Sequence, residues 1–73
     1  MNKQEWLEYI TDYINKDEYK RAVSWHIRLN LEDKFNYTTA KINYELSKLV
    51  KDGLLNKDTS KYCTTYTLKD EQN

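Results

Sequence analysis

The sequence predicts a small, mainly helical α+β domain with three helices followed by a two-stranded β-hairpin. Apolar residues recur at helical spacing in three stretches, no Pro interrupts them, and the segment that follows the single Gly is rich in Thr and Tyr. A chain of 73 residues has room for one core, so we expect a single domain over residues 1–73 with a polar tail at about 70–73. Seven Tyr and two Trp add apolar area to a chain with few aliphatic residues.

The first predicted helix runs from residue 3 to residue 15. Glu5 and Glu8 lie near its start, where negative charge interacts favourably with the helix dipole. One helical stripe, spaced by three and four residues, contains Trp6, Leu7, Ile10, Tyr13 and Ile14.

The second helix is predicted over about residues 19–35, because apolar residues there step by four. These residues are Tyr19, Val23, Ile27, Leu31 and Phe35. Trp25, Leu29 and Leu31 also alternate as in a strand, so a short strand near residues 25–29 followed by a shorter helix is the alternative. Asn36 tolerates the left-handed conformation that ends many helices, so we expect a turn there.

The third helix, over residues 39–52, has the clearest signals. Thr38 is a suitable N-cap and Gly53 stands where a helix end most often needs glycine. Its apolar stripe comprises Ala40, Ile42, Leu46, Leu49 and Val50. The hairpin follows, and Tyr62 and Tyr66 on one strand face are expected to pack in it.

Four further side chains have expected structural places. Trp6 and Trp25 are expected mostly in the core, with one of them available as a dimer anchor. His26 has no second ligand-type residue at metal-binding spacing, so we expect a structural or surface His. Cys63 is the only cysteine and is expected half-buried in a strand.

The net charge is zero, but the charges are unevenly distributed along the chain. Residues 1–19 hold two basic and five acidic groups, whereas residues 20–61 hold nine basic and five acidic groups. One cysteine permits no internal disulfide, which fits a reducing cytoplasm, and no apolar run is long enough to cross a membrane. We therefore expect a cytoplasmic protein without membrane partners.

The sequence offers little for catalysis. One Gly cannot form a phosphate-binding glycine-rich loop, and no metalloprotease, hydrolase or paired-cysteine motif is present. We expect no enzyme activity, no metal and no cofactor.

The segment from Glu32 to Leu55 reads EDKFNYTTAKINYELSKLVKDGLL and resembles the helix-turn-helix and following strand of bacterial and phage winged-helix regulators. Phe35 occupies the first apolar position of that motif, Asn36 replaces the turn Gly, and Thr38 is the capping hydroxyl. Ile42, Leu46 and Leu49 match the buried positions of the second motif helix. The order helix, helix, turn, helix, hairpin extends the resemblance over nearly the whole chain.

The resemblance implies a transcriptional regulator that reads double-stranded DNA through its third helix. On that helix Thr39, Lys41, Asn43 and Tyr44 would face bases, while Thr38 and the free amides at the helix start would hold a phosphate. Candidate contacts to the DNA backbone are Lys34, Lys48, Lys57 and Lys61. A domain of this size would commonly bind as a homodimer.

Two alternatives remain at this point. The polar residues of the third helix can be an ordinary solvated face, and Lys57 and Lys61 can be solubilising turn residues. The second functional hypothesis is a winged-helix module that binds protein, such as a phage-encoded inhibitor or adaptor of a host factor. The richness in Lys, Asn and Tyr indicates an AT-rich genome, such as that of a phage or a low-GC bacterium.

Overall fold

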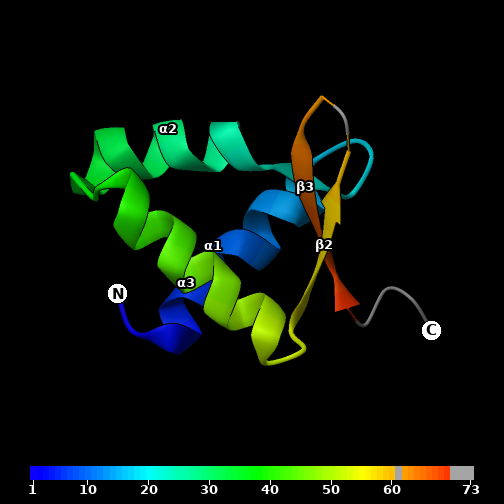
Figure 1. The fold of residues 1–73 in the computed structure, drawn as a ribbon, viewed down its shortest axis with the longest axis horizontal. Helices are drawn as coiled ribbons and strands as arrows, with labels where there is room; N and C mark the ends of the chain where they lie inside the picture. Colours follow the sequence, from blue (N-terminus) through cyan, green and yellow to red (C-terminus); the bar gives the residue numbers. More distant parts are fainter. Residues whose placement is uncertain (61, 70–73) are drawn as a thin grey trace.

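The computed structural model describes residues 1–60 and 62–69 and has three helices and a three-stranded antiparallel sheet. The elements follow in the order α1 (Lys3–Lys16), β1 (Ala22–Val23), α2 (Ser24–Phe35), α3 (Thr39–Lys51), β2 (Leu55–Thr59) and β3 (Thr64–Leu68). Figure 1 shows α2 along one side of the molecule, α3 crossing below it, and the β2–β3 hairpin at the end opposite the α2–α3 turn. The predicted mainly helical α+β class is confirmed.

The sheet contains one strand more than the sequence predicted. Its order is β1-β3-β2, with Ala22 opposite Tyr66 and Val23 opposite Thr65. The two-stranded hairpin is present, since β2 and β3 pair from Leu55 and Leu68 to Thr59 and Thr64. The short strand β1 extends the hairpin at its β3 edge.

The predicted helix over residues 19–35 is wrong at its N-terminal end. Lys20 has a φ of 57°, and the side chain of Asp17 accepts hydrogen bonds from the backbone N–H groups of Tyr19 (2.8 Å) and Arg21 (3.3 Å). This turn reverses the chain into β1, so α2 begins only at Ser24. The alternative strand near residues 25–29 is also wrong, because that stretch is helical.

The other predicted helix boundaries agree closely with the structure. A capping box starts α1, in which Asn2 accepts from the Glu5 backbone and Glu5 accepts from the Asn2 backbone. Asn36 ends α2 in the left-handed conformation with a φ of 58°, and Gly53 follows α3 with a φ of 78°. Asn36 and Gly53 therefore have the roles predicted for them.

Thr38 caps α3, since its hydroxyl oxygen accepts a hydrogen bond from the Lys41 backbone N–H at 3.1 Å. Thr38→Ala is expected to lower the free energy of unfolding by about 1 kcal/mol, because the first turn of α3 loses that acceptor. Urea unfolding followed by circular dichroism measures the change. Thr38→Ser keeps a hydroxyl and should stay close to wild type, and an equal loss in both variants would show that the cap is not the cause.

The core lies between the three helices and the inner face of the sheet. Its buried residues are Trp6, Ile10, Ile14, Ala22, Ile27, Leu31, Ile42, Leu46, Leu49, Leu55 and Tyr66. Beside it, the ring of Tyr37 stacks on Trp6 at 5.5 Å and on Phe35 at 5.7 Å between ring centroids. The turn between α2 and α3 is thus attached to α1 through aromatic contacts.

Several aromatic and sulfur side chains differ in their placement from the sequence prediction. Trp6 is fully buried as expected, but Trp25 is 47% exposed. Tyr66 is buried, whereas Tyr62 precedes β3 and is 88% exposed, so packing of Tyr62 in the hairpin was a wrong prediction. Cys63 is partly buried but precedes β3 rather than lying in it, and His26 is on the surface.

Candidate functional site

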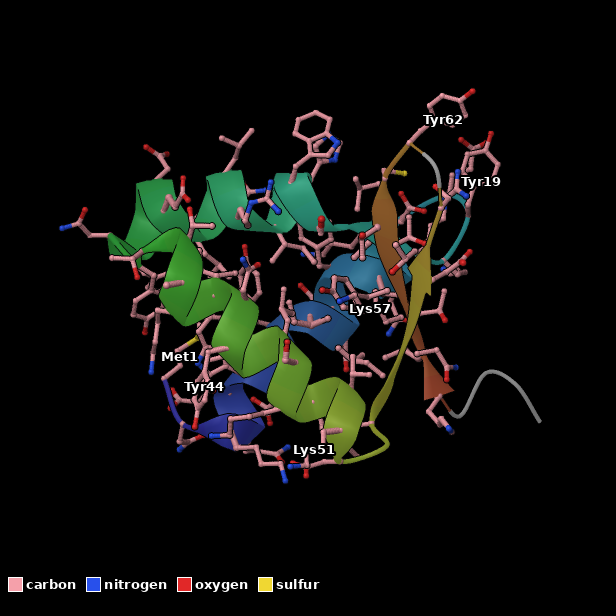
Figure 2. All side chains as sticks on the ribbon, in the orientation of Figure 1. Met1, Tyr19, Tyr44, Lys51, Lys57 and Tyr62 are labelled. Carbon is pink, nitrogen blue, oxygen red and sulfur yellow. The ribbon has the colours of Figure 1, made fainter. Side chains whose placement is uncertain are left out.

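Helix α3 has one face in the core and one face in solvent. Ile42, Leu46 and Leu49 are buried. On the opposite side Tyr44 is 60% exposed. The exposed residues of the helix and its N-cap are Thr38, Thr39, Ala40, Lys41, Asn43, Tyr44, Ser47 and Lys51, with Lys48 half-buried beside them. Figure 2 shows Tyr44 and Lys51 projecting from α3 on the side away from α2.

A buried carboxylate lies along one edge of this exposed face. Glu45 is only 8% exposed, and its carboxylate oxygens lie 3.2 Å from Lys41 Nζ and 4.0 Å from Lys48 Nζ. Lys48 Nζ also lies 5.2 Å from the centroid of the Tyr44 ring. We call Lys41, Tyr44, Glu45 and Lys48 the Glu45 cluster.

The Glu45 cluster orders two lysines and lowers their combined charge. Each ammonium group is held along the helix by the same carboxylate, so the three ionised groups carry one net positive charge. Sequence reasoning selected both lysines but missed Glu45. The signal was available, since Glu45 is four residues after Lys41 and three before Lys48, which places all three side chains on one side of a helix.

Two threonines at the start of α3 have hydroxyls with different partners. Thr38 accepts from the Lys41 N–H, so its own O–H proton remains available to donate to a ligand oxygen. Thr39 donates its O–H proton to Glu32 Oε1 of α2 at 2.6 Å. The hydroxyl of Thr39 is therefore used in fastening α3 to α2, and its methyl group is the part left for a ligand.

An ion pair fastens the other end of α3 to α1. Lys3 Nζ lies 2.6 Å from Asp52 Oδ2, and the hydrogen bond from Lys3 holds the pKa of Asp52 below its ordinary value. Asp52 therefore stays ionised with Lys3 as its ion-pair partner, and the charges of Lys48 and Lys51 act on it in the same direction. Lys51, which sequence reasoning did not select, is exposed and adds a positive charge to the exposed face of α3.

On the hairpin, Lys57 shares the strand face of the buried Leu55 and is therefore directed to the side of the sheet that carries the helices. Figure 2 shows it between α3 and the hairpin. Lys57 is opposite Tyr66 in the β2–β3 pair. Burial raises the pKa of Tyr66, and the positive charge of Arg28 on α2 acts in the opposite direction. Arg28, which was missed from the sequence, is thus a cation close to the tyrosine that lies opposite Lys57 in the sheet.

Lys34 is separated from the other predicted site residues. It lines a surface pocket together with Tyr9, Asp12 and Tyr13 of α1 and with Asn30. That pocket lies between α1 and α2, whereas the exposed face of α3 is turned away from it. The structure thus places Lys34 with residues of α1, and its predicted contact to the DNA backbone stays a prediction. Lys61 lies outside the described residues.

The described part of the chain holds no group of three or more His, Cys, Asp or Glu side chains that could bind a metal ion. Within that same part, none of the helices has the length and apolar character that crossing a bilayer requires.

What the structure brings together is a basic and aromatic surface on α3, with Arg28 and Lys57 at the junction of α2 and the hairpin. We call Lys41, Asn43, Tyr44, Lys48 and Lys51 the α3 surface.

Comparison of the chain with protein-family models, with curated proteins and with solved structures finds no match. The functional argument therefore rests on the α3 surface itself.

Proposed function

We propose that the protein is a small winged-helix protein that binds double-stranded DNA through the α3 surface and acts as a transcriptional regulator. The observation that carries the proposal is the exposure of Lys41, Asn43 and Tyr44 on the first turns of a helix that follows a tight, left-handed turn. In the helix-turn-helix mode, those turns are the part that reaches base edges in the major groove. The order of the helices and the hairpin agrees with this mode.

The residues of the α3 surface suit different parts of a DNA duplex. The amide of Asn43 can make two hydrogen bonds to an adenine edge, and Lys41 can donate to guanine or to phosphate. Thr38, with its available O–H proton and the backbone N–H groups at the start of α3, is suited to one phosphate. Lys48, Lys51, Lys57 and Arg28 are suited to the phosphates on either side.

The distribution of charge explains how a neutral chain can bind a polyanion. The acidic residues of α1 include Glu5, Glu8 and Asp12, whereas α3 carries three lysines and one glutamate. Because salt screens charges over about 10 Å, DNA at the α3 surface interacts mainly with the nearby lysines rather than with the average charge of the chain. Glu45 limits this attraction, so the proposal predicts moderate affinity.

Fluorescence anisotropy of labelled duplex DNA, titrated with the protein at several salt concentrations, tests this function. With about four to six phosphates neutralised, the affinity should fall by about a hundred- to a thousandfold between 50 and 200 mM salt. AT-rich and random duplexes should give the same salt slope if the slope comes from contacts to phosphates and the sequence preference comes from contacts to bases. Absence of binding at 50 mM salt would reject the proposal.

Glu45→Gln is expected to tighten DNA binding several-fold, because Lys41 and Lys48 then carry two uncompensated charges. The substitution preserves the size of the buried side chain, and the amide can still accept a hydrogen bond from Lys41. Anisotropy at 100 mM salt measures the effect. The matched control is Glu8→Gln, which removes an exposed carboxylate on α1 and should leave the affinity unchanged. Equal tightening by both variants would mean that only the total charge matters.

A protein partner for the α3 surface is the second candidate function. Its support is Tyr44, a largely exposed aromatic residue beside the paired charges of the Glu45 cluster, because protein interfaces are enriched in tyrosine. If neutralising Lys41 and Lys48 leaves the DNA affinity unchanged, DNA does not bind at the α3 surface. That result would favour a protein partner for this surface.

A further inference from the structure

A small surface pocket lies between α1 and α2 and is separate from the α3 surface. Its volume is about 140 Å³, and it is lined by Tyr9, Asp12, Tyr13, Lys16, Asn30 and Lys34. A protein cavity of about 150 Å³ can hold one benzene molecule. The pocket therefore has room for a ligand with a single six-membered ring. We call it the α1–α2 pocket.

Two tyrosines form the aromatic wall of the α1–α2 pocket. The ring centroids of Tyr9 and Tyr13 are 6.4 Å apart. Phe35 of α2 meets the Tyr9 ring edge to face at 6.3 Å, and Asn30 Nδ2 lies 3.5 Å from the Tyr13 hydroxyl oxygen. Asn30 is itself held by a hydrogen bond of 3.0 Å to the His26 carbonyl. Contacts with α2 thus hold both tyrosines of α1 in place, and the wall is preorganised for a flat apolar group.

One positive charge in the pocket has no carboxylate partner. Lys16 Nζ lies 2.9 Å from Asp12 Oδ2, and the hydrogen bond and charge of Asp12 raise the pKa of Lys16. These two charges compensate each other. Among the residues that the structure describes, no Asp or Glu forms an ion pair with Lys34. The ionised groups that line the pocket therefore carry one net positive charge.

The phenol groups of the pocket add hydrogen-bond donors to this charge. Burial raises the pKa of both Tyr9 and Tyr13, so both hydroxyls stay protonated at neutral pH. The Tyr13 oxygen accepts from Asn30, so its own proton remains available to donate. A cation together with O–H donors suits an oxyanion such as a carboxylate.

We infer that the α1–α2 pocket binds a small aromatic carboxylate, with its ring against Tyr9 and Tyr13 and its carboxylate beside Lys34. The volume limits the ligand to one ring, and the aromatic wall favours a flat apolar group. The single uncompensated charge favours a monoanion, because a dianion would keep an unpaired charge and a neutral ring would leave Lys34 unpaired. The inference concerns this pocket alone and does not depend on DNA binding.

Benzoate is the simplest probe of this chemistry. Nuclear magnetic resonance titration of the ¹⁵N-labelled full chain at constant ionic strength should show saturable amide shifts at Tyr13, Asn30 and Lys34, with a dissociation constant of about 0.3–3 mM. Acetate lacks the ring and benzamide lacks the charge, so each should bind at least about tenfold more weakly. No saturable shift with benzoate up to about 20 mM, or equal binding of either control ligand, would overturn the inference.

Removal of the uncompensated charge tests the place of the carboxylate. Lys34→Gln should weaken benzoate binding at least about fivefold and leave benzamide binding unchanged. Lys34 is exposed, so the circular dichroism spectrum should remain that of wild type. The matched control Lys69→Gln removes an exposed lysine that follows β3 and should bind benzoate as wild type does. Unchanged affinity of Lys34→Gln, or equal losses in the two variants, would contradict the inferred site.

Removal of the pocket carboxylate should have the opposite effect. Asp12→Asn is expected to tighten benzoate binding several-fold, because Lys16 then adds a second uncompensated charge. The Asp12 side chain is 66% exposed, so we expect the fold to be retained. The control Asp58→Asn removes an exposed carboxylate from β2 and should leave the affinity unchanged. Benzoate binding that Asp12→Asn does not tighten, or that Asp58→Asn tightens equally, would overturn carboxylate binding in this pocket.

Discussion

Trp6→Ala is expected to lower the free energy of unfolding by about 3–5 kcal/mol, because it removes the largest fully buried side chain of the core. A chain of 73 residues has a total stability of about 4–11 kcal/mol, so the variant should be close to unfolding at room temperature. The ring of Trp6 also stacks on Tyr37 at 5.5 Å, so its loss loosens the turn between α2 and α3. Thermal and urea unfolding followed by circular dichroism measure the effect.

The matched control is Trp25→Ala, which removes the same side chain from the surface. We expect a change within about 1 kcal/mol, since Trp25 is 47% exposed. Similar losses from both substitutions would contradict the packing of α2 in the structure.

The second large expected effect is a loss of DNA affinity when both lysines of the Glu45 cluster are neutralised. Substituting either lysine alone would leave the buried carboxylate of Glu45 with one of its two ion-pair partners, and Glu at position 41 would add a like charge four residues away. The appropriate variant is therefore Lys41→Gln/Glu45→Gln/Lys48→Gln, compared with Glu45→Gln alone. The triple variant should bind DNA about 50-fold more weakly at 0.1 M salt, with the salt slope reduced by about two.

A charge control separates the α3 surface from a general loss of positive charge. Lys16→Gln/Lys20→Gln removes two lysines from the end of α1 and the following turn, and we expect less than a twofold change in DNA affinity. Equal losses from the triple variant and from this control would contradict specific binding at the α3 surface.

The helix boundaries were predictable where the chain contains strong local signals. Thr38 and Gly53 bracket α3, and Asn36 adopts the left-handed conformation that was expected of it. In each case the decisive interaction is within a few residues along the sequence, such as the bond from the Lys41 N–H to Thr38. Local chemistry of this kind is visible in a sequence.

The start of α2 was not predictable in the same way. Strand β1 contains two residues and exists because Ala22 pairs with Tyr66, which is far along the chain. Two residues show no periodicity, so the pairing has no sequence signal. Helix α2 also has apolar residues on opposite faces, and only the packed helices decide that Ile27 is buried and Trp25 is exposed.

The candidate site was predictable to the extent that it follows from one helix. Exposure of Lys41, Asn43 and Tyr44 follows from the apolar stripe of α3. The separation of Lys34 from this surface depends on how α1 packs against α2, which no motif encodes. The burial of Glu45 and the position of Arg28 near Tyr66 likewise depend on contacts between elements.

The most direct test of DNA binding by the α3 surface is a nuclear magnetic resonance titration of ¹⁵N-labelled protein with a short duplex. We predict the largest amide shifts at Lys41, Asn43 and Tyr44, smaller shifts at Lys57, and none at Glu8 of α1. Shifts concentrated on α1 or around the exposed Trp25 and Leu29 of α2, or no shifts with excess duplex at low salt, would contradict the proposed function.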